Sequence, residues 1–246
     1  MGLDPEFERI PAGIRLNPNP QFEFNKYIID ATHDLVCAYK PNPAFYESRG
    51  IDGISDLKMT CDYISKNYPK IPIIIDAKRG DIGNTNKGYA KFVFEYLCAD
   101  AITVMPYMGI ESLKVFFDYS DKGIILGCHS SNPGAREFQE LTINDKPLYH
   151  IVADELMKAH GNNQNAMIFM GATYPEELTN IRKIIGDMTM LVPGVGAQGG
   201  DVKTFVTAGK NSKGRGLLIN SSRGIIFANS PMDEAEKLRD EINSYR

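Results

Sequence analysis

The sequence has no tryptophan, only four cysteines and no long hydrophobic run. No segment approaches the ~18 consecutive apolar residues that span a bilayer, so a membrane protein is not expected. The N-terminus has no basic region followed by an apolar stretch, which argues against a signal peptide. The cysteines are far apart and form no Cys-x-x-Cys pair, which favours reduced core thiols in a cytoplasmic protein over a disulfide framework or zinc site: Cys37, Cys61, Cys98 and Cys128.

The chain also has no strong excess of charge of either sign. Its 27 Lys and Arg residues against 31 Asp and Glu residues give a net charge of −4 over 246 residues. This mildly acidic balance argues against nucleic acid or an anionic membrane surface as the main partner. The hydrophobic share of 43% and charged share of 24% are ordinary for a globular protein, so the chain can bury a full core.

Short apolar runs alternate with amphipathic segments along the whole chain. Strands covered on both faces in a parallel sheet have this near-continuous apolar character. Eight strand–helix units in a chain near ~250 residues predict a single-domain (β/α)8 TIM barrel over residues 1–246, and an open doubly wound sheet remains the competing layout. The expected strands are 35–40, 71–76, 101–105, 123–128, 166–171, 188–193 and 216–220, with a very short first strand at Gly2-Leu3-Asp4.

The segments between these runs carry helix signals. Apolar residues recur at spacings of three and four between Ile54 and Tyr68, which places them on one helix face. Thr173-Tyr174-Pro175-Glu176 has the capping-box pattern of a helix start. Ser230-Pro231 provides a cap and a proline at the first position of a last helix.

The densest group of chemically active residues lies in segment 73–85. Asp76 and Lys78 are two apart at a strand end, so their side chains leave the same face, and Asp81 follows in the next loop. Lys40 ends another expected strand and completes an alternating Lys-Asp-Lys-Asp array. Carboxylate neighbours favour the charged form of a lysine, which suits it to stabilise and then protonate a developing carbanion. The alternative is a ring of salt bridges that ties strand ends together.

Two segments near the C-terminus predict a phosphate-binding site. Residues 193–201 form a glycine-rich loop after the seventh strand, and Gln198 is its strongest polar side chain. The loop contains Gly-x-Gly-x-x-Gly, but it lies in the seventh unit, whereas a dinucleotide fingerprint belongs to a first βαβ unit. After the eighth strand, Arg223 offers a fork of donors and Gly224 permits close backbone approach. A flexible surface turn and a surface ion pair are the structural alternatives.

A polar loop follows the fifth strand at residues 129–135. Its hydroxyl groups, that of Ser131 among them, could contact the polar edge of a ring, although a simple turn explains the same composition. His129 could act as a base, but no Ser-His-Asp or metal-ligand spacing supports that role.

Together these segments resemble the orotidine 5′-phosphate decarboxylase family. Asp76-x-Lys78-x-x-Asp81-Ile82-x-x-Thr85 is similar to its signature, and the Asp-Ala-Lys-Arg-Gly-Asp and Gly-Ala-Thr-Tyr-Pro-Glu-Glu stretches resemble its bacterial second-type subfamily. The resemblance runs from Gly2 to the end of the chain. The other matching segments occur in the family's order: Tyr39-Lys40-Pro41-Asn42, Ser131-Asn132-Pro133-Gly134, Pro193-Gly194-Val195-Gly196-Ala197-Gln198 and Asn220-Ser221-Ser222-Arg223-Gly224.

The resemblance implies conversion of orotidine 5′-monophosphate to uridine 5′-monophosphate and CO2 in de novo pyrimidine biosynthesis, without metal or organic cofactor. It also implies a homodimer in which Asp81, Ile82 and Thr85 are donated to the partner's site. The roles it assigns are a catalytic array of Lys40, Asp76, Lys78 and Asp81; ribose contacts from Asp4 and Lys40; a pyrimidine contact from Ser131; and phosphate contacts from Gln198, Arg223 and the Gly224 amide.

The chain departs from the family pattern at three places. It begins inside the first strand, which is therefore expected to be truncated, and it has Met105 and His129 where the subfamily usually has Asn and Arg. Two other functions stay open. One is a magnesium-dependent sugar-phosphate decarboxylase or aldolase of the same superfamily, although Lys40 stands where that branch has a metal-facing Glu. The other is a non-catalytic nucleotide-binding barrel.

Overall fold

A parallel sheet forms most of the central wall of the protein in a computed structural model that describes residues 1–171, 175–194 and 202–246. Its strands are hydrogen-bonded in the order β3-β4-β5-β8-β9-β10, and every pairing is parallel. In sequence order they are β3 (Ile74–Arg79), β4 (Ala101–Val104), β5 (Gly123–His129), β8 (Ala166–Met170), β9 (Met190–Pro193) and β10 (Leu217–Asn220).

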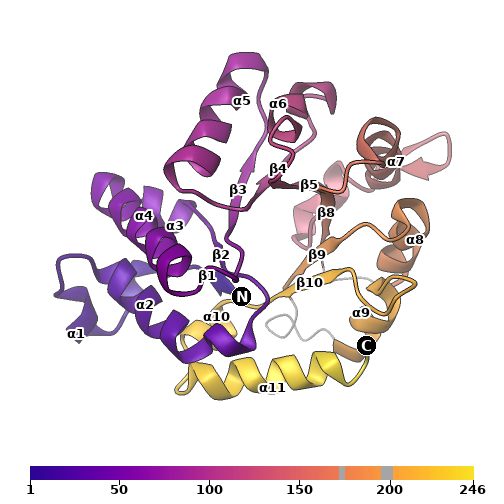
Figure 1. Ribbon diagram of the computed structural model, residues 1–246. Coiled ribbons are helices and arrows are strands. Elements are labelled where there is room, and N and C mark those ends of the chain that lie inside the picture. Colours follow the sequence, from indigo (N-terminus) through magenta and orange to yellow (C-terminus); the bar gives the residue numbers. More distant parts are fainter. Residues whose placement is uncertain (172–174, 195–201) are drawn as a thin grey trace.

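Two short strands close this sheet into a barrel. β1 (Gly2–Leu3) pairs in parallel with β2 (Lys40–Pro41), and a bridge between Tyr39 and Ile73 connects the pair to the segment before β3. At the other side, the Gly2 amide donates to the carbonyl of Ser221, directly after β10, at 2.8 Å. Within the described residues, eight parallel strands therefore surround the centre, with helices outside them (Figure 1). The predicted TIM barrel is confirmed.

Helices cover the outside of the barrel, and no helix in the described ranges is both long and apolar enough to cross a membrane. Short 3-10 helices occur at Phe7–Arg9, His33–Leu35, Glu111–Leu113 and Pro133–Glu137, and a π-helix at Lys91–Tyr96. The α-helices are α1 (Ala12–Arg15), α2 (Pro20–Thr32), α3 (Ala44–Glu47), α4 (Gly50–Asn67), α5 (Gly83–Ala90), α6 (Lys114–Phe117), α7 (Leu148–His160), α8 (Pro175–Ile185), α9 (Val202–Gly209), α10 (Arg223–Ile226) and α11 (Pro231–Asn243).

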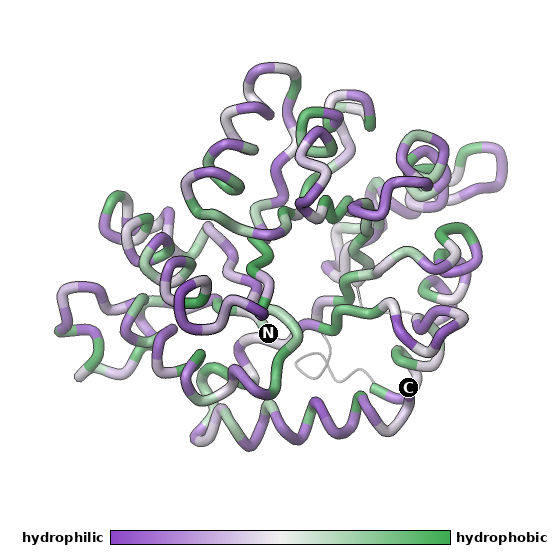
Figure 2. The backbone as a smooth tube through the Cα atoms, in the orientation of Figure 1, coloured by the Kyte–Doolittle hydropathy of each residue, from purple (hydrophilic) through white to green (hydrophobic). Residues whose placement is uncertain are grey.

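The helix signals of the sequence are confirmed where the structure describes them. α4 buries its predicted stripe, including Leu57, Cys61 and Ile64. The side chain of Ser230 caps α11 by accepting from the Asp233 amide at 3.3 Å. Thr173, the expected cap of α8, lies outside the described residues. Figure 2 shows the resulting pattern, with hydrophobic residues along the central strands and hydrophilic residues on the outer helix turns.

Three local features differ from the predictions. The second strand is shorter than 35–40, because His33–Leu35 form a 3-10 turn and only Lys40–Pro41 are strand. β3 begins at Ile74, after Pro72, which has no N–H for the ladder, and it runs on to Arg79. An unpredicted hairpin joins β6 (Thr142–Ile143) to β7 (Lys146–Pro147). Its turn residues Asn144 and Asp145 have φ of 51° and 62°, the left-handed conformation that such two-residue turns require.

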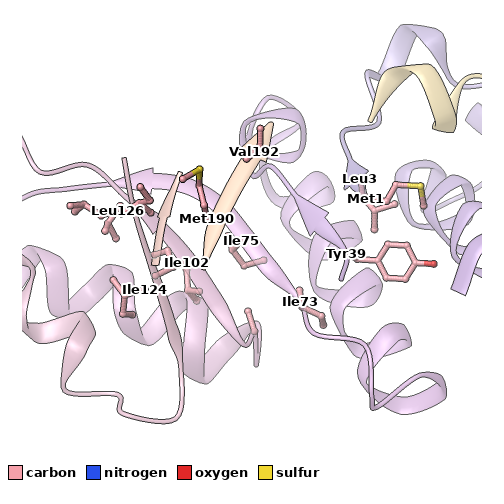
Figure 3. Packing of buried hydrophobic residues seen from close by; sticks show 14 of the residues in the cluster. Met1, Leu3, Tyr39, Ile73, Ile75, Ile102, Ile124, Leu126, Met190 and Val192 are labelled. Carbon is pink, nitrogen blue, oxygen red and sulfur yellow. The ribbon is translucent and has the colours of Figure 1, made fainter. Parts of the chain in front are cut away.

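Alternation along the strands divides the core into two layers. Ile73 and Ile75 belong to the large cluster between the strands and the helices, which Figure 3 shows with Ile102, Ile124 and Val192. Ile74, between them, faces the opposite way and belongs to a small cluster inside the barrel, as period-two strand geometry requires. The inner cluster consists of Ala38, Ile74, Ala101, Ile125, Phe169 and Leu191.

The contact between α3 and α4 requires a glycine at position 53. A Cβ atom there would lie 1.9 Å from the carbonyl oxygen of Tyr46. We expect Gly53→Ala to lower the free energy of unfolding by about 1–3 kcal/mol, because the two helices must move apart. Gly13→Ala in α1, where a Cβ would have no neighbour within 4 Å among the described residues, is the matched control and should change stability by less than about 1 kcal/mol. Urea unfolding measures both; equal effects would contradict this account.

Candidate functional site

The carboxylate of Asp76, on β3, lies between two lysine side chains. The Lys40 ammonium, from β2, donates to Asp76 Oδ2 at 2.8 Å, and the Lys78 ammonium donates to both carboxylate oxygens at 2.8 Å. The side chain of Lys40 is only 5% exposed, whereas that of Lys78 is 47% exposed. Lys78 therefore presents its ammonium toward open space, while Lys40 holds the carboxylate from the buried side.

Neutral hydrogen-bond donors complete the surroundings of Asp76. Thr103, on β4, donates its hydroxyl to Asp76 Oδ1 at 3.0 Å, and the Asn42 side-chain amide donates to Oδ2 at 3.3 Å. Burial alone would raise the pKa of Asp76, but the charges of Lys40 and Lys78 outweigh burial and hold that pKa well below its ordinary value. The carboxylate is therefore a permanent anion that fixes both lysines.

The backbone of β3 is irregular where it carries Lys78. The register with β4 shifts between Ile75 and Arg79. Lys78 has φ of 47°, in the left-handed region that residues other than glycine rarely adopt. The Lys78 amide donates to Thr103 Oγ1 at 3.0 Å, so one hydroxyl holds both the bulge and the carboxylate. Strained backbone that the surroundings hold in place is common at functional sites.

Asp81 lies in the loop between β3 and α5, apart from the two lysines. Its Oδ1 accepts from the Ile82 amide at 2.7 Å, and no ion pair joins it to Lys40 or Lys78 within the described part of the chain. Buried Asn86 anchors the loop by bonding the Asp81 backbone and the carbonyl of Ser112. Ile82 is 56% exposed, and Thr85 is also exposed. Of the four predicted catalytic residues, a single chain brings together Lys40, Asp76 and Lys78.

Two buried acceptors without partners lie where β1 and β10 meet. Among the described residues, neither Asp4 Oδ1 nor Asn220 Oδ1 has a hydrogen-bond partner. Asp4 follows β1 and Asn220 ends β10, and these strand ends are adjacent because Gly2 bonds Ser221. Buried acceptors left unpaired are costly, so both suit a ligand that brings donors. Asn220 was not among the predicted site residues, and a polar residue at the end of an apolar strand was its sequence signal.

The predicted phosphate residues are described only in part. Arg223 and Gly224 are exposed at the start of α10, and among the described residues a Cβ on Gly224 would have only Ser221 Oγ as a neighbour, at 4.0 Å. The Gly194 amide donates to the carbonyl of Asn220 at 3.2 Å, which ties the residue directly after β9 to the end of β10. Gln198 and the rest of 195–201 lie outside the described residues.

The loop after β5 is packed closely against the end of β8. Ser131 is partly buried, and a Cβ on Gly171 would lie 2.5 Å from the Ser131 amide, so only glycine permits this approach. Beside the loop, a cavity of about 570 Å³ is lined by Met105, His129 and Phe169 among others. Phe169 also lies 6.0 Å from the Lys78 ammonium, which links this cavity to the charged residues.

A separate titratable group surrounds His129, the last residue of β5. One oxygen of Glu140 and one of Glu177, together with a ring nitrogen of His129, lie within 4.8 Å of one another. Histidine and glutamate are residue types that bind transition metals. The three residues are far apart in the sequence, which explains why no spacing motif revealed them. However, Glu177 faces Nδ1 at 3.0 Å and Glu140 faces Nε2 at 3.4 Å. Neither ring nitrogen of His129 has a hydrogen-bond partner among the described residues, so these close contacts are not aligned hydrogen bonds.

Known proteins resemble this chain over its whole length. The sequence model described as "Orotidine 5'-phosphate decarboxylase / HUMPS family" matches residues 14–238. An orotidine 5′-phosphate decarboxylase from Flavobacterium johnsoniae is 50% identical over 241 residues, covering 98% of this chain and 88% of the relative. One from Cellvibrio japonicus is 46% identical over 255 residues, covering 100% and 93%. The structure of Leishmania donovani OMP decarboxylase matches with a TM-score of 0.90 at 37% identity, covering 99% and 92%.

Replacing Asp76 should destabilise the fold. Asp76→Asn leaves two ammonium groups, one of them buried, without their carboxylate, and we expect a loss of roughly 3–5 kcal/mol in the free energy of unfolding near neutral pH. Asp62→Asn removes an exposed ion pair with Lys58 and should cost at most about 1 kcal/mol. Chemical denaturation of the three proteins measures the difference.

The difference in the free energy of unfolding between wild type and Asp76→Asn should also depend on pH in one direction. Because the pKa of Asp76 is lower in the folded chain than its ordinary value, its stabilisation is complete above about pH 4 and is lost as pH falls. The stability gap between wild type and Asp76→Asn should therefore narrow in acid. A gap that stays constant as pH falls would contradict the paired carboxylate.

Proposed function

Because the chain belongs to the orotidine 5′-phosphate decarboxylase / HUMPS family, we propose that it converts orotidine 5′-monophosphate to uridine 5′-monophosphate and CO2. This reaction is a step of pyrimidine biosynthesis. The observation that supports it best is the Lys40–Asp76–Lys78 group, in which a buried cation and a buried anion hold a second, open ammonium in place. Such a group serves a reaction in which negative charge develops on carbon.

The chemistry follows from where the electron pair goes. When the bond between C6 of the pyrimidine and its carboxylate breaks, CO2 leaves and the pair stays on C6 in the ring plane. The Lys78 ammonium stabilises that charge, because its attraction grows as the charge develops, and it then donates a proton to C6. Lys78 afterwards takes a proton from solvent. Asp76 keeps the ammonium oriented and faces the departing carboxylate, whose repulsion fades as CO2 leaves.

The remaining polar groups would bind different parts of the nucleotide. Asp4 and Lys40 would bind the ribose hydroxyls, and the unpaired acceptor of Asp4 supports this role. Ser131 would contact the pyrimidine. Gln198, Arg223 and the Gly224 amide would bind the phosphate, and the exposed Arg223 and the free space at Gly224 support that assignment. Binding energy from this remote phosphate can hold the reacting ring against Lys78.

A homodimer would complete the site. The loop that carries Asp81 is held by Asn86 yet exposes Ile82 and Thr85. An anchored loop with an exposed apolar side chain suits donation to a neighbouring subunit. We therefore propose that Asp81, Ile82 and Thr85 of one subunit enter the site of the other, where Asp81 would join the charged array.

Two rival functions remain distinguishable. A magnesium-dependent sugar-phosphate decarboxylase or aldolase would need cation ligands at the barrel mouth. The Lys40 ammonium is already hydrogen-bonded to the Asp76 carboxylate, and its positive charge would repel Mg²⁺. A non-catalytic barrel would bind the nucleotide without consuming it. The Lys78 ammonium, half exposed beside an acid, favours catalysis over simple binding.

Lys78→Ala should abolish turnover while leaving nucleotide binding largely intact. We expect the ultraviolet signal of orotidine 5′-monophosphate loss to fall by at least about 10²–10³-fold, since a preorganised charge that stabilises the transition state is removed. The affinity for uridine 5′-monophosphate, measured by calorimetry, should change far less.

Two outcomes of the same assay would overturn the proposed reaction. Wild-type activity that disappears with excess chelator and returns with Mg²⁺ would favour the sugar-phosphate branch. Wild-type binding of uridine 5′-monophosphate without any consumption of orotidine 5′-monophosphate would favour the non-catalytic barrel.

The shared site predicts complementation between two inactive variants. Mixing Lys78→Ala with Asp81→Asn subunits should restore roughly a quarter of wild-type activity, because half of randomly mixed dimers are mixed and each then contains one intact site. Activity of each variant alone is the control. An absence of rescue, with subunit exchange shown by mass spectrometry of tagged chains, would count against the shared site.

A further inference from the structure

Three side chains of metal-binding types meet at the end of β5, outside the Lys40–Asp76–Lys78 group. His129 ends β5, Glu140 lies in the segment between β5 and α7, and Glu177 lies in the first turn of α8. One ring nitrogen and one oxygen of each carboxylate lie within 4.8 Å of one another. Three separate elements therefore bring one nitrogen donor and two oxygen donors to one place.

The imidazole of His129 is directed into this group without a hydrogen bond. Its side chain is 2% exposed, and neither ring nitrogen has a hydrogen-bond partner among the described residues. Glu177 Oε2 is also buried without a hydrogen-bond partner in that part of the chain. Buried polar atoms without partners are costly. A ligand that accepts lone pairs from both side chains would remove this cost.

The separations in the group suit donors around a metal ion. Zinc–donor distances of about 2.0–2.2 Å in a tetrahedral arrangement place neighbouring donors about 3.3–3.6 Å apart. Glu177 and Glu140 lie 3.0 Å and 3.4 Å from their nearest ring nitrogens, and neither contact is aligned as a hydrogen bond. Small rotations of these side chains would bring one nitrogen and two oxygens to the separations that a shared ion requires.

The donor types favour a divalent transition metal. Imidazole and carboxylate ligands occur together around Zn²⁺, whereas Mg²⁺ prefers oxygen ligands. The neighbouring thiol of Cys128 does not belong to the group, because it donates to the carbonyl of Tyr149 at 3.0 Å. Arg136 lies 3.6 Å from Glu140 but is mostly exposed, so water screens much of its charge. Two carboxylates can therefore offset the charge of a divalent cation.

The group is accessible from one side. A cavity of about 280 Å³ is lined by His129, Ser131, Arg136 and Glu140 among others. An ion can enter from this cavity, which a stable metal site requires. A water molecule from the same cavity can occupy the fourth coordination position beside the three side chains.

We propose that His129, Glu140 and Glu177 bind a divalent transition-metal ion, with Zn²⁺ as the best match. The site is structural and lies outside the group that carries the proposed reaction. The ion joins the end of β5 to the segment between β5 and α7 and to the start of α8, so it stabilises the folded chain.

The ion would also fix the loop after β5. Gln139, next to Glu140, accepts from the Ser130 amide at 2.7 Å. The carbonyl of His129 accepts from the Gly171 amide at 2.8 Å. Both ends of the loop are thus attached to residues of the metal site or to their neighbours. An effect on nucleotide binding follows from this attachment, and this consequence alone rests on the proposed function.

The test measures Zn²⁺ binding by calorimetry to the full chain without an affinity tag, after a chelator has removed bound metal. Wild type should bind one tight equivalent. His129→Arg supplies N–H donors to both glutamates but no lone pair to a metal, so this equivalent should be lost while the fold is kept. Glu177→Gln should weaken binding by at least about tenfold, since even residues that only support metal ligands change affinity by this much.

Two matched variants should keep the tight equivalent of wild type. His33→Gln removes a histidine that also faces a carboxylate, that of Asp34 at 3.1 Å, but closer to the surface. Glu176→Gln changes an exposed neighbour of Glu177 in the same turn. The exposed thiols of Cys37 and Cys98 are present in every variant, so zinc bound there does not contribute to the differences.

Thermal unfolding provides an independent measurement. Zn²⁺ should raise the Tm of wild type, because an ion that binds only the folded chain stabilises it, and should not raise the Tm of His129→Arg. Equal Zn²⁺ affinities for wild type, His129→Arg and Glu177→Gln would overturn the proposal. Wild type that binds no tight equivalent, or that Mg²⁺ stabilises as well as Zn²⁺ does, would also overturn it.

Nucleotide measurements separate this proposal from the proposed reaction. Removal of metal should weaken uridine 5′-monophosphate binding by wild type about tenfold, the equivalent of one charge-assisted contact, and Zn²⁺ but not Mg²⁺ should restore it. An unchanged nucleotide affinity would overturn the effect on the loop. The expected zinc binding without consumption of orotidine 5′-monophosphate would support the metal site and overturn only the decarboxylase. Turnover with equal zinc affinities in all variants would overturn only the metal site.

Discussion

The charge pairing at Asp76 is the interaction on which the site depends. A buried carboxylate and a buried ammonium are each costly to remove from water, and the Asp76–Lys40 contact at 2.8 Å makes both tolerable. The pairing also determines where Lys78 can lie, because the same carboxylate accepts from its ammonium. Three residues from two neighbouring strands thus form a single unit. Removing Asp76 leaves two ammonium groups without a counter-charge, whereas removing either lysine leaves the carboxylate paired with the other.

The barrel provides this unit with rigid support. Parallel strands all end on the same rim, so Lys40, Asp76 and Thr103 reach one place from β2, β3 and β4. Small side chains in the inner cluster, such as Ala38 and Ala101, leave the volume to larger neighbours. Closure between Gly2 and Ser221 brings together the segments that carry Asp4 and Asn220, each with a buried acceptor that has no partner among the described residues. The binding groups therefore come from residues at both ends of the sequence.

Much of the fold and part of the site were predictable from local patterns. The apolar runs located six barrel strands to within about three residues, whereas the second expected strand overlaps the observed one only at Lys40. Polar residues at the strand ends pointed to Lys40, Asp76 and Lys78. Local patterns did not reveal the bulge at Lys78 or the support from Thr103, because both depend on the register between β3 and β4. The hairpin at Asn144 and Asp145 was also missed, since two-residue strands are too short to show alternation.

The amino-acid sequence alone determined the order of strands and helices and the set of charged residues that end the strands, because periodicity and composition act locally. Only the tertiary structure decided which charges meet. Lys40 and Asp76 are 36 positions apart, and His129 lies against glutamates from two different elements. The direction of a side chain at a strand end depends on register, bulges and closure of the whole sheet, and these are set by contacts between residues distant in the chain.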